Sequence, residues 1–454
     1  MAKRSYEMDM CNGPLFGNML RFTFPLILSG ILQLMFSAAD TVVVGQFVGT
    51  TALAAVGSTG PLITLIVNLF IGLSEGANLM ASRHYGAKHW EDMERSIHTS
   101  MTLSLIIGIA LSIVGNIMTV ELLKLVGTPH DVLDQATIYM RIYFCALPLS
   151  MVYNFASAIL RAVGDTRRPL YYLIISGLLN VGLNVLFVVA FHLDVVGVGL
   201  ATALTQLLST VLVVRSLLKN DGPCHIELKK LRIYKKELID IARVGIPTGL
   251  QSVIFAFANV VIQSAINSFG SAAIAGNTAA SSIESVVMTG VMAFRQAAVT
   301  FTSQNLGAHK FDRIDRGIKI CTAVVIVIGL VAGGGAYLLG RTLLRIYTSD
   351  PEAIEYGMTR LRYTCAPYLV AGVMDVFVGA NRGLGAYIVP MIISVLGTCG
   401  LRILWIYTAL PLNRTFEMLF MPFSLFWLIT GAALIIYFFI VKKRVYKAAC
   451  GSQS

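Results

Sequence analysis

Twelve long apolar runs constrain this chain more than any other feature of its sequence. They span residues 19–46, 52–81, 96–119, 133–159, 168–191, 195–218, 242–268, 273–302, 318–340, 358–380, 388–411 and 416–441. A helix needs about 20 apolar residues to cross a bilayer, and every run is at least that long. Only 13% of the 454 residues are charged, against about 25% in a typical soluble domain. The pattern predicts an all-α polytopic membrane protein with twelve transmembrane helices.

The basic charge of the chain follows the expected membrane topology. If the N-terminus is cytoplasmic, the inner segments hold 26 of the 35 Lys and Arg residues, and the outer loops hold four. Cytoplasmic loops carry an excess of Lys and Arg, so we expect both termini in the cytoplasm. The net charge of +11 is then a topology signal, and we expect no nucleic-acid partner. Residues 1–18 lack the pattern of a signal peptide, and the seven cysteines form no C-x-x-C pair.

An internal repeat divides the chain into two halves. Ser82, Gly86, Ala87, Arg95 and Ile97 recur as Ser303, Gly307, Ala308, Arg316 and Ile318, each offset by 221 residues. Six runs per half return the chain to the side from which it started, so we expect two lobes of the same orientation. The symmetry axis would lie along the membrane normal, with a central cavity between the lobes. Such symmetry is typical of transporters.

The expected organisation follows from the repeat and from one basic stretch in the middle of the chain. It comprises an N-terminal segment at 1–18, an N-terminal six-helix lobe at 19–218, a cytoplasmic linker at 219–238, a C-terminal six-helix lobe at 239–441 and a cytoplasmic tail at 442–454.

Asp40 is the least expected residue of the first run, since no charged neighbour accompanies it. A carboxylate in hydrocarbon costs about 2.5–3.5 kcal/mol on insertion scales and normally marks an ion or substrate pathway. Depth along the helices groups it with Asn180, Asn184 and Thr202. These oxygen-bearing side chains suit a proton or Na⁺. Structural hydrogen bonds between helices are the alternative for all four residues.

A second polar set lies in the C-terminal half. Glu284, Asp375 and Arg402 fall inside apolar runs, and Gln251 and Asn259 lie on the seventh run. We expect Glu284 to be the acidic anchor of this network, which would attract a cationic drug or a proton. The alternative is an ion pair of Glu284 or Asp375 with Arg402, because charges survive in hydrocarbon when they are paired.

Several of these motifs together resemble a known family. They are Pro25 and Asp40, the twin Gly-Ala turns at 82–97 and 303–318, the stretch 158–166 and the stretch 304–308. Over essentially its full length the chain is similar to the multidrug and toxic compound extrusion (MATE) family. Asn305, combined with Glu284 and its two neighbours, resembles the staphylococcal-type bacterial multidrug exporters most closely.

The resemblance implies twelve helices in two lobes and the export of organic cations or similar drugs in exchange for Na⁺ or H⁺. Asp40, Asn180, Asn184 and Thr202 match the N-lobe cation site of the family, with Asn184 where some relatives have a second Asp. Some relatives also carry a Glu in the seventh helix, where this chain has no acid between residues 251 and 259.

We therefore predict a cation-coupled antiporter that exports varied, mostly cationic drugs by alternating access, and not an enzyme. The expected setting is the bacterial plasma membrane, with lipids and drug-like molecules as partners, a monomeric state and no cofactor besides the coupling ion. The alternative is a flippase or exporter of a lipid-linked saccharide or another lipid-like substrate. An ATP-driven pump is excluded, because the glycine-rich stretch 335–342 has Arg in place of Lys and follows an apolar run.

Overall fold

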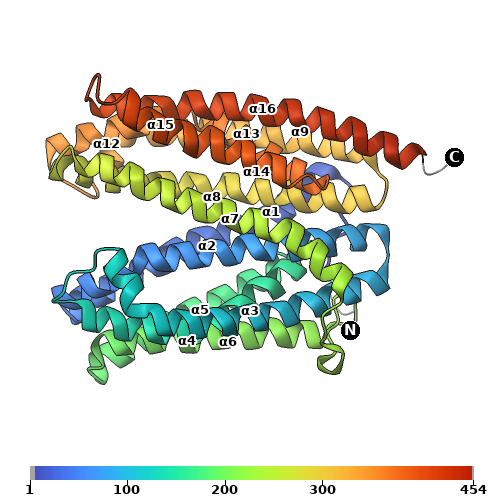
Figure 1. Ribbon diagram of the computed structural model, residues 1–454, viewed down its shortest axis with the longest axis horizontal. Helices are drawn as coiled ribbons and strands as arrows, with labels where there is room; N and C mark the ends of the chain where they lie inside the picture. Colours follow the sequence, from blue (N-terminus) through green and yellow to red (C-terminus); the bar gives the residue numbers. More distant parts are fainter. Residues whose placement is uncertain (1–5, 452–454) are drawn as a thin grey trace. The chain divides into compact units, whose positions relative to one another are not determined.

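The computed structural model describes residues 6–451, and helices are its regular structure. Figure 1 shows the helices of the first half in blue to yellow-green. They are α1 (Leu15–Phe47), α2 (Thr50–Ala87), α3 (Trp90–Leu125), α4 (Leu133–Ala162), α5 (Arg167–Val185) with a π-helical end (Leu186–Ala190), α6 (Asp194–Leu218), a short 3₁₀ turn (Leu228–Lys230) and α7 (Lys235–Asn267).

The second half follows the same design with more interruptions. It contains α8 (Ser271–Gly307), α9 (Phe311–Ile328) with a π-helical turn (Gly329–Gly333), α10 (Gly334–Leu338), α11 (Gly340–Leu344), α12 (Pro351–Thr364), α13 (Tyr368–Gly383), α14 (Ile388–Ser394) with a π-helical turn (Val395–Gly400), α15 (Leu401–Thr408) and α16 (Phe416–Gly451). Each of the twelve predicted runs lies on one helical segment or on several consecutive ones.

Two of the predicted spans are not single, continuous, strongly apolar helices. Among the described residues, ten helical segments are long and apolar enough to cross a membrane, and the bent pair α12 and α13 adds an eleventh when the two helices are counted as one span. The pair bends by 47° beside Pro367, which lacks the N–H that a continuous helix requires. The remaining predicted run, 273–302, lies on α8, whose many Ser, Thr, Gly and Ala residues make it less apolar than the ten candidate spans.

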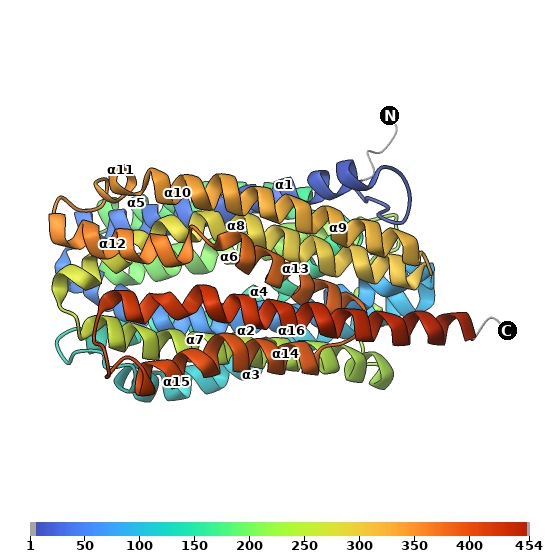
Figure 2. The same cartoon turned by 90° about the horizontal axis from the view of Figure 1, so that it is seen from above.

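The described chain divides into two compact units. Unit 1 contains Leu28–Gly249 and the residues up to Asp9, and unit 2 contains Met10–Ile27 and the residues from Leu250 onward. Helices α1 and α7 each pass from one unit into the other. Helix α16 packs against α12 and α13 of unit 2, and Figure 2 shows it as one long helix. The lobe boundaries expected from the repeat stay a prediction, and Lys3 and Arg4 lie outside the described residues.

Small residues let the helices of unit 1 approach closely. Gly177 of α5 lies directly against the ring of Phe36 of α1, where a Cβ atom would overlap the ring. On α2, a Cβ added to Gly72 would lie 2.6 Å from the Cα atom of Gly249 on α7. Transmembrane helices commonly pack through such small residues, because apolar burial alone does not drive their association in lipid. The first of these contacts brings the Asp40 end of α1 beside α5.

In unit 2, α8 packs against both α12 and α13. A Cβ added to Gly379 of α13 would lie 2.6 Å from the carbonyl oxygen of Arg295 on α8. The apolar core continues through large buried rings such as Phe294 and Phe420. This close packing sets the rotation of α8 and thereby the direction in which Glu284 points.

Candidate functional site

Two helices of unit 1, α1 and α5, bring Asp40, Asn180 and Asn184 together. Asn180 and Asn184 are four residues apart on α5, so both face α1. The Asn184 amide donates to Asp40 Oδ1 over 2.7 Å, and Asn184 is fully buried while Asn180 is 8% exposed. On α6, Thr205 lies 3.3 Å from the Asn180 amide. A carboxylate that is costly in the membrane is therefore met by neutral amides.

The orientation of the Asn180 amide follows from its surroundings. With its nitrogen turned toward α1, the amide donates to Asp40 Oδ1 over 2.7 Å and to Oδ2 over 3.2 Å, and its oxygen accepts from Thr205. Two amides then donate to one carboxylate, which is the arrangement that an ionised Asp40 favours. Asn184 Oδ1 is buried without a hydrogen bond among the described residues. The site thus holds one uncompensated carboxylate and one spare acceptor oxygen.

Thr202 lies on α6 three residues before Thr205, and the contacts of its side chain are with Val198 and Tyr139. Its hydroxyl donates to the Val198 carbonyl of its own helix over 3.0 Å. The Tyr139 hydroxyl of α4 contacts Thr202 and lies near the charge of Asp40. Thr205 could have been found from its helical spacing to Thr202, but Tyr139 could not, because only the packing of α4 brings it here.

The donor set fits a small hard cation. Asp40, Asn180 and Asn184 offer carboxylate and amide oxygens, to which Thr202 would add a hydroxyl; Na⁺ accepts such oxygens as ligands, and the carboxylate alone can accept a proton. The described part of the chain places no Lys or Arg in an ion pair with Asp40. Cation binding at these residues stays a prediction.

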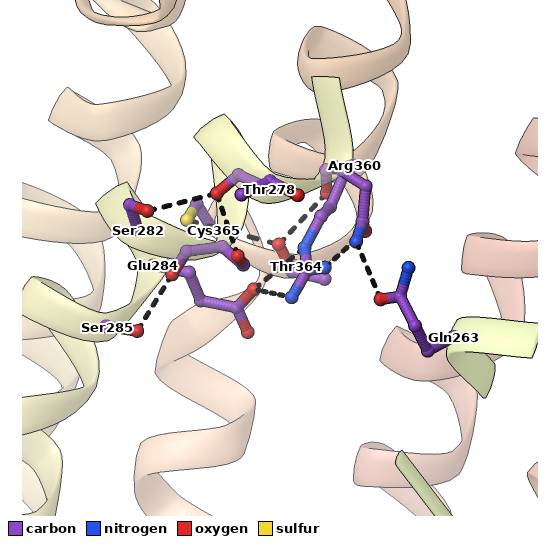
Figure 3. Close-up of polar contacts among 10 residues, drawn as sticks. Gln263, Thr278, Ser282, Glu284, Ser285, Arg360, Thr364 and Cys365 are labelled. Atoms are coloured by element: carbon purple, nitrogen blue, oxygen red, sulfur yellow. Dashed lines mark hydrogen bonds and ion pairs between the residues drawn. The ribbon is translucent and has the colours of Figure 1, made fainter. Parts of the chain in front are cut away.

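Glu284 forms a charged pair with Arg360 of α12, as Figure 3 shows. The guanidinium donates to Glu284 Oε2 through Nη2 over 2.8 Å and through Nε over 3.1 Å. Arg360 also donates to Asn277, whose amide donates to Gln263 of α7 over 3.3 Å. The two charged side chains are only 14% and 16% exposed. The charge of Glu284 is therefore compensated within unit 2.

The predicted alternative is an ion pair of Glu284 or Asp375 with Arg402; for Glu284, α12 brings Arg360 to the acid instead. Arg402 of α15 lies over the ring of Phe423, 3.8 Å from its centre, in a cation–π contact. Its Nε atom is buried without a hydrogen bond among the described residues. A planar guanidinium can stack on an aromatic ring, as in Arg402, or donate two hydrogen bonds to a carboxylate, as in Arg360.

Gln251, a further predicted residue of the second set, has a partner of its own in unit 2. Gln251 accepts a hydrogen bond of 2.8 Å from Arg382 of α13, and both residues are buried. Asn259 is exposed on α7, and Asp375 is half-buried on α13. Arg360, Asn277 and Gln263 were missed, because their relation to Glu284 depends on helix packing and not on spacing along the chain.

Comparison with known proteins assigns the family. The MatE family model matches residues 25–186 and again residues 247–408, one match in each half of the chain. A probable multidrug resistance protein, YoeA of Bacillus subtilis, is 27% identical over 393 residues, which cover 85% of each chain. An FAD transporter of Shewanella oneidensis is 25% identical over 404 residues, 87% of each chain.

Two further matches agree with this result. The multidrug export protein MepA of Staphylococcus aureus is 23% identical over 402 residues, covering 87% of this chain and 88% of its own. The fold is similar to that of a multidrug resistance MATE family transporter in an outward-facing conformation, with a TM-score of 0.91, 20% identity and coverage of 98% of this chain and all of the other. The predicted fold class is confirmed, and this chain belongs to the MATE family of multi-span membrane transporters, which are not enzymes.

Proposed function

We propose that this transporter exports drug-like organic molecules in exchange for H⁺ or Na⁺ that binds at Asp40. The proposal rests on a carboxylate that, within residues 6–451, is held by neutral amides, and on a buried, spare amide oxygen of Asn184 beside it. An uncompensated acid in a membrane span is a site where a cation gains free energy by binding.

Cation binding would reverse the hydrogen bonds between α1 and α5. Both amides now present N–H groups to Asp40. A protonated Asp40 becomes a donor and needs an amide oxygen as its partner, and Na⁺ likewise needs the oxygens of Asn180 and Asn184 to face it. Either ion therefore turns the amides around and changes how α1 is held. A ligand changes a conformational equilibrium only through such a difference between the two states.

The composition of the site leaves H⁺ and Na⁺ both open. Asn184 stands where a second carboxylate would add negative charge for Na⁺. We expect Asn184→Asp to increase the share of transport that an Na⁺ gradient drives, because two carboxylates attract a metal cation more strongly than one.

The substrates follow from the relatives and from the charge balance of unit 2. Relatives named as multidrug exporters favour varied organic molecules, and the cationic dye ethidium is a suitable probe. The relative named as an FAD transporter raises an anionic substrate as the second candidate. Since Glu284 already neutralises Arg360, this arginine provides no free positive charge for an anion. We therefore favour cationic substrates, with export from the cytoplasm by a monomer.

The test uses membrane vesicles that contain the whole protein and measures ethidium transport under a pH gradient or an Na⁺ gradient, each applied alone. We expect one gradient to drive transport and Asp40→Asn to reduce it to the level of vesicles without the protein. Asp134→Asn is the matched control, because Asp134 is an exposed acid at the start of α4. Normal transport by Asp40→Asn would contradict the proposal, and FAD transport without ethidium transport would favour the anionic alternative.

A further inference from the structure

We propose that the turn between α2 and α3 binds a divalent transition-metal ion of the Zn²⁺ type through His84, His89 and Asp92. One ligand atom of each side chain lies within 4.8 Å of the other two. His84 belongs to the last turn of α2, and Asp92 to the first turn of α3. Lys88 between them has a left-handed backbone with φ of 58°, and this reverses the chain so that the three side chains converge.

The geometry is close to that of a metal site. Ligand atoms about 2.1 Å from a tetrahedral Zn²⁺ lie about 3.4 Å from one another. His89 Nδ1 is 3.8 Å from Asp92 Oδ2. The side chains of His89 and Asp92 are 67% and 31% exposed. They can therefore rotate by the small amount that brings their ligand atoms to metal-binding distance. Their exposure also provides a path by which an ion enters.

A buried carboxylate supports the site from α7. Glu237 Oε2 lies 3.5 Å from His84 Nε2, and the Glu237 side chain is 2% exposed. Neither atom makes a hydrogen bond in the part of the chain that the structure describes. An imidazole that binds a metal usually donates its other N–H group to a carboxylate, which fixes the ring. We assign this positioning role to Glu237.

The other half of the repeat gives an internal contrast. The positions 221 residues after the three ligands are Asn305, Lys310 and Arg313. Lys310 Nζ donates to the Cys11 carbonyl over 2.9 Å, and Arg313 Nη2 donates to the Met10 carbonyl over 3.1 Å. In unit 2 the two basic side chains of the equivalent turn therefore donate hydrogen bonds to backbone carbonyls near the start of the chain.

The same three positions in unit 1 carry residue types that bind metals. Imidazole and carboxylate together suit Zn²⁺ and its neighbours among the first-row ions. A bound ion would join α2 to α3 directly and, through Glu237, to α7. The competing explanation is a metal-free ion pair between a protonated His84 and Glu237.

The experiment uses the full-length protein without a histidine tag, purified in detergent and stripped of metal with a chelator. Zn²⁺ is titrated against a fluorescent chelator, and Co²⁺ is titrated by visible absorption. We expect one ion per chain. Glu237→Gln should weaken the affinity by about 10–100-fold, and His89→Ala should weaken it more. Since His89 is exposed, its loss should leave folding intact, which the thermal midpoint of the metal-free protein checks.

His309→Ala is the matched control, because His309 is an exposed histidine in the equivalent turn of unit 2. It should bind Zn²⁺ and Co²⁺ as the parent protein does. The absence of saturable binding at micromolar metal would overturn the proposal, and so would equal binding by His89→Ala and the parent. Either result would leave the ion pair as the explanation of the His84–Glu237 contact, and neither affects the role proposed for Asp40.

Discussion

Asp40 and Glu284 are two acids within membrane spans that the protein treats in different ways. Neutral amides hold Asp40, so its charge stays available to a mobile cation. Arg360 holds Glu284 with two hydrogen bonds, so this charge is already balanced. A buried ion pair is strongly destabilised when only one partner is removed, because the other charge is left uncompensated. The difference predicts different outcomes when each acid is neutralised.

We expect Glu284→Gln to lower the free energy of unfolding by about 3–5 kcal/mol, since it strands Arg360 in the membrane. The double variant Glu284→Met with Arg360→Met should recover most of this loss, because both charges are gone. Thermal unfolding in detergent measures the effect. The control is Glu355→Gln, which breaks an ion pair with Arg341 whose side chains are 60% and 63% exposed, and it should cost less than about 1 kcal/mol.

A different result would assign Glu284 to substrate binding. If Glu284→Gln is as stable as the parent protein but exports a different range of drugs, the acid contacts substrate during transport. Reduced yield with an unchanged range of drugs would support the structural ion pair.

At the level of helices, the contact between α1 and α5 decides whether the cation site can form. The ring of Phe36 fills the space that Gly177 leaves open. Asp40 lies one helical turn beyond Phe36, and Asn180 and Asn184 follow Gly177 on α5. Any group that separates the helices at Gly177 must therefore lengthen the distance from Asp40 to its amides.

We expect Gly177→Ala to reduce cation-driven ethidium transport at least about tenfold. This corresponds to a loss of about 1.4 kcal/mol in the free energy of forming the cation site at Asp40. Gly182→Ala is the control on the same helix, because a Cβ added there meets no atom within 4 Å. Replacing Phe36 by Ala together with Gly177→Ala should restore part of the transport, since the smaller side chain makes room. Equal transport by the two single variants would show that this contact does not position the site.

At the scale of the whole molecule, the repeat and the charge distribution predict how the chain lies in the membrane. Both halves contain six spans, and the basic loops alternate with weakly charged ones. The linker that contains Lys229 should then be cytoplasmic, and the turn between α3 and α4 that contains Asp131 should face outward. Both side chains are exposed, so each position is accessible to a labelling reagent.

The topology can be tested with single cysteines in a variant that lacks the seven native ones. A membrane-impermeant maleimide should label Asp131→Cys in intact cells and should label Lys229→Cys only after the cells are opened. The opposite result would invert the topology and would place the proposed metal site outside the cell.

The sequence alone determined the membrane class, the twelve spans, the repeat and the isolation of Asp40. These properties are local: backbone groups in lipid must be satisfied within each helix, and an acid among apolar residues is visible without any partner. Helical spacing was also sufficient to place Asn180 and Asn184 on one face of α5.

Only the tertiary structure decided which residues meet across helices. Arg360 pairs with Glu284, because α12 packs against α8. Tyr139 joins Thr202 through the packing of α4, and Glu237 reaches His84 through the packing of α7. The physical reason is that the length and composition of a span predict how deep each residue lies in the membrane. The rotation of the span about its own axis depends on close contacts with the neighbouring helices.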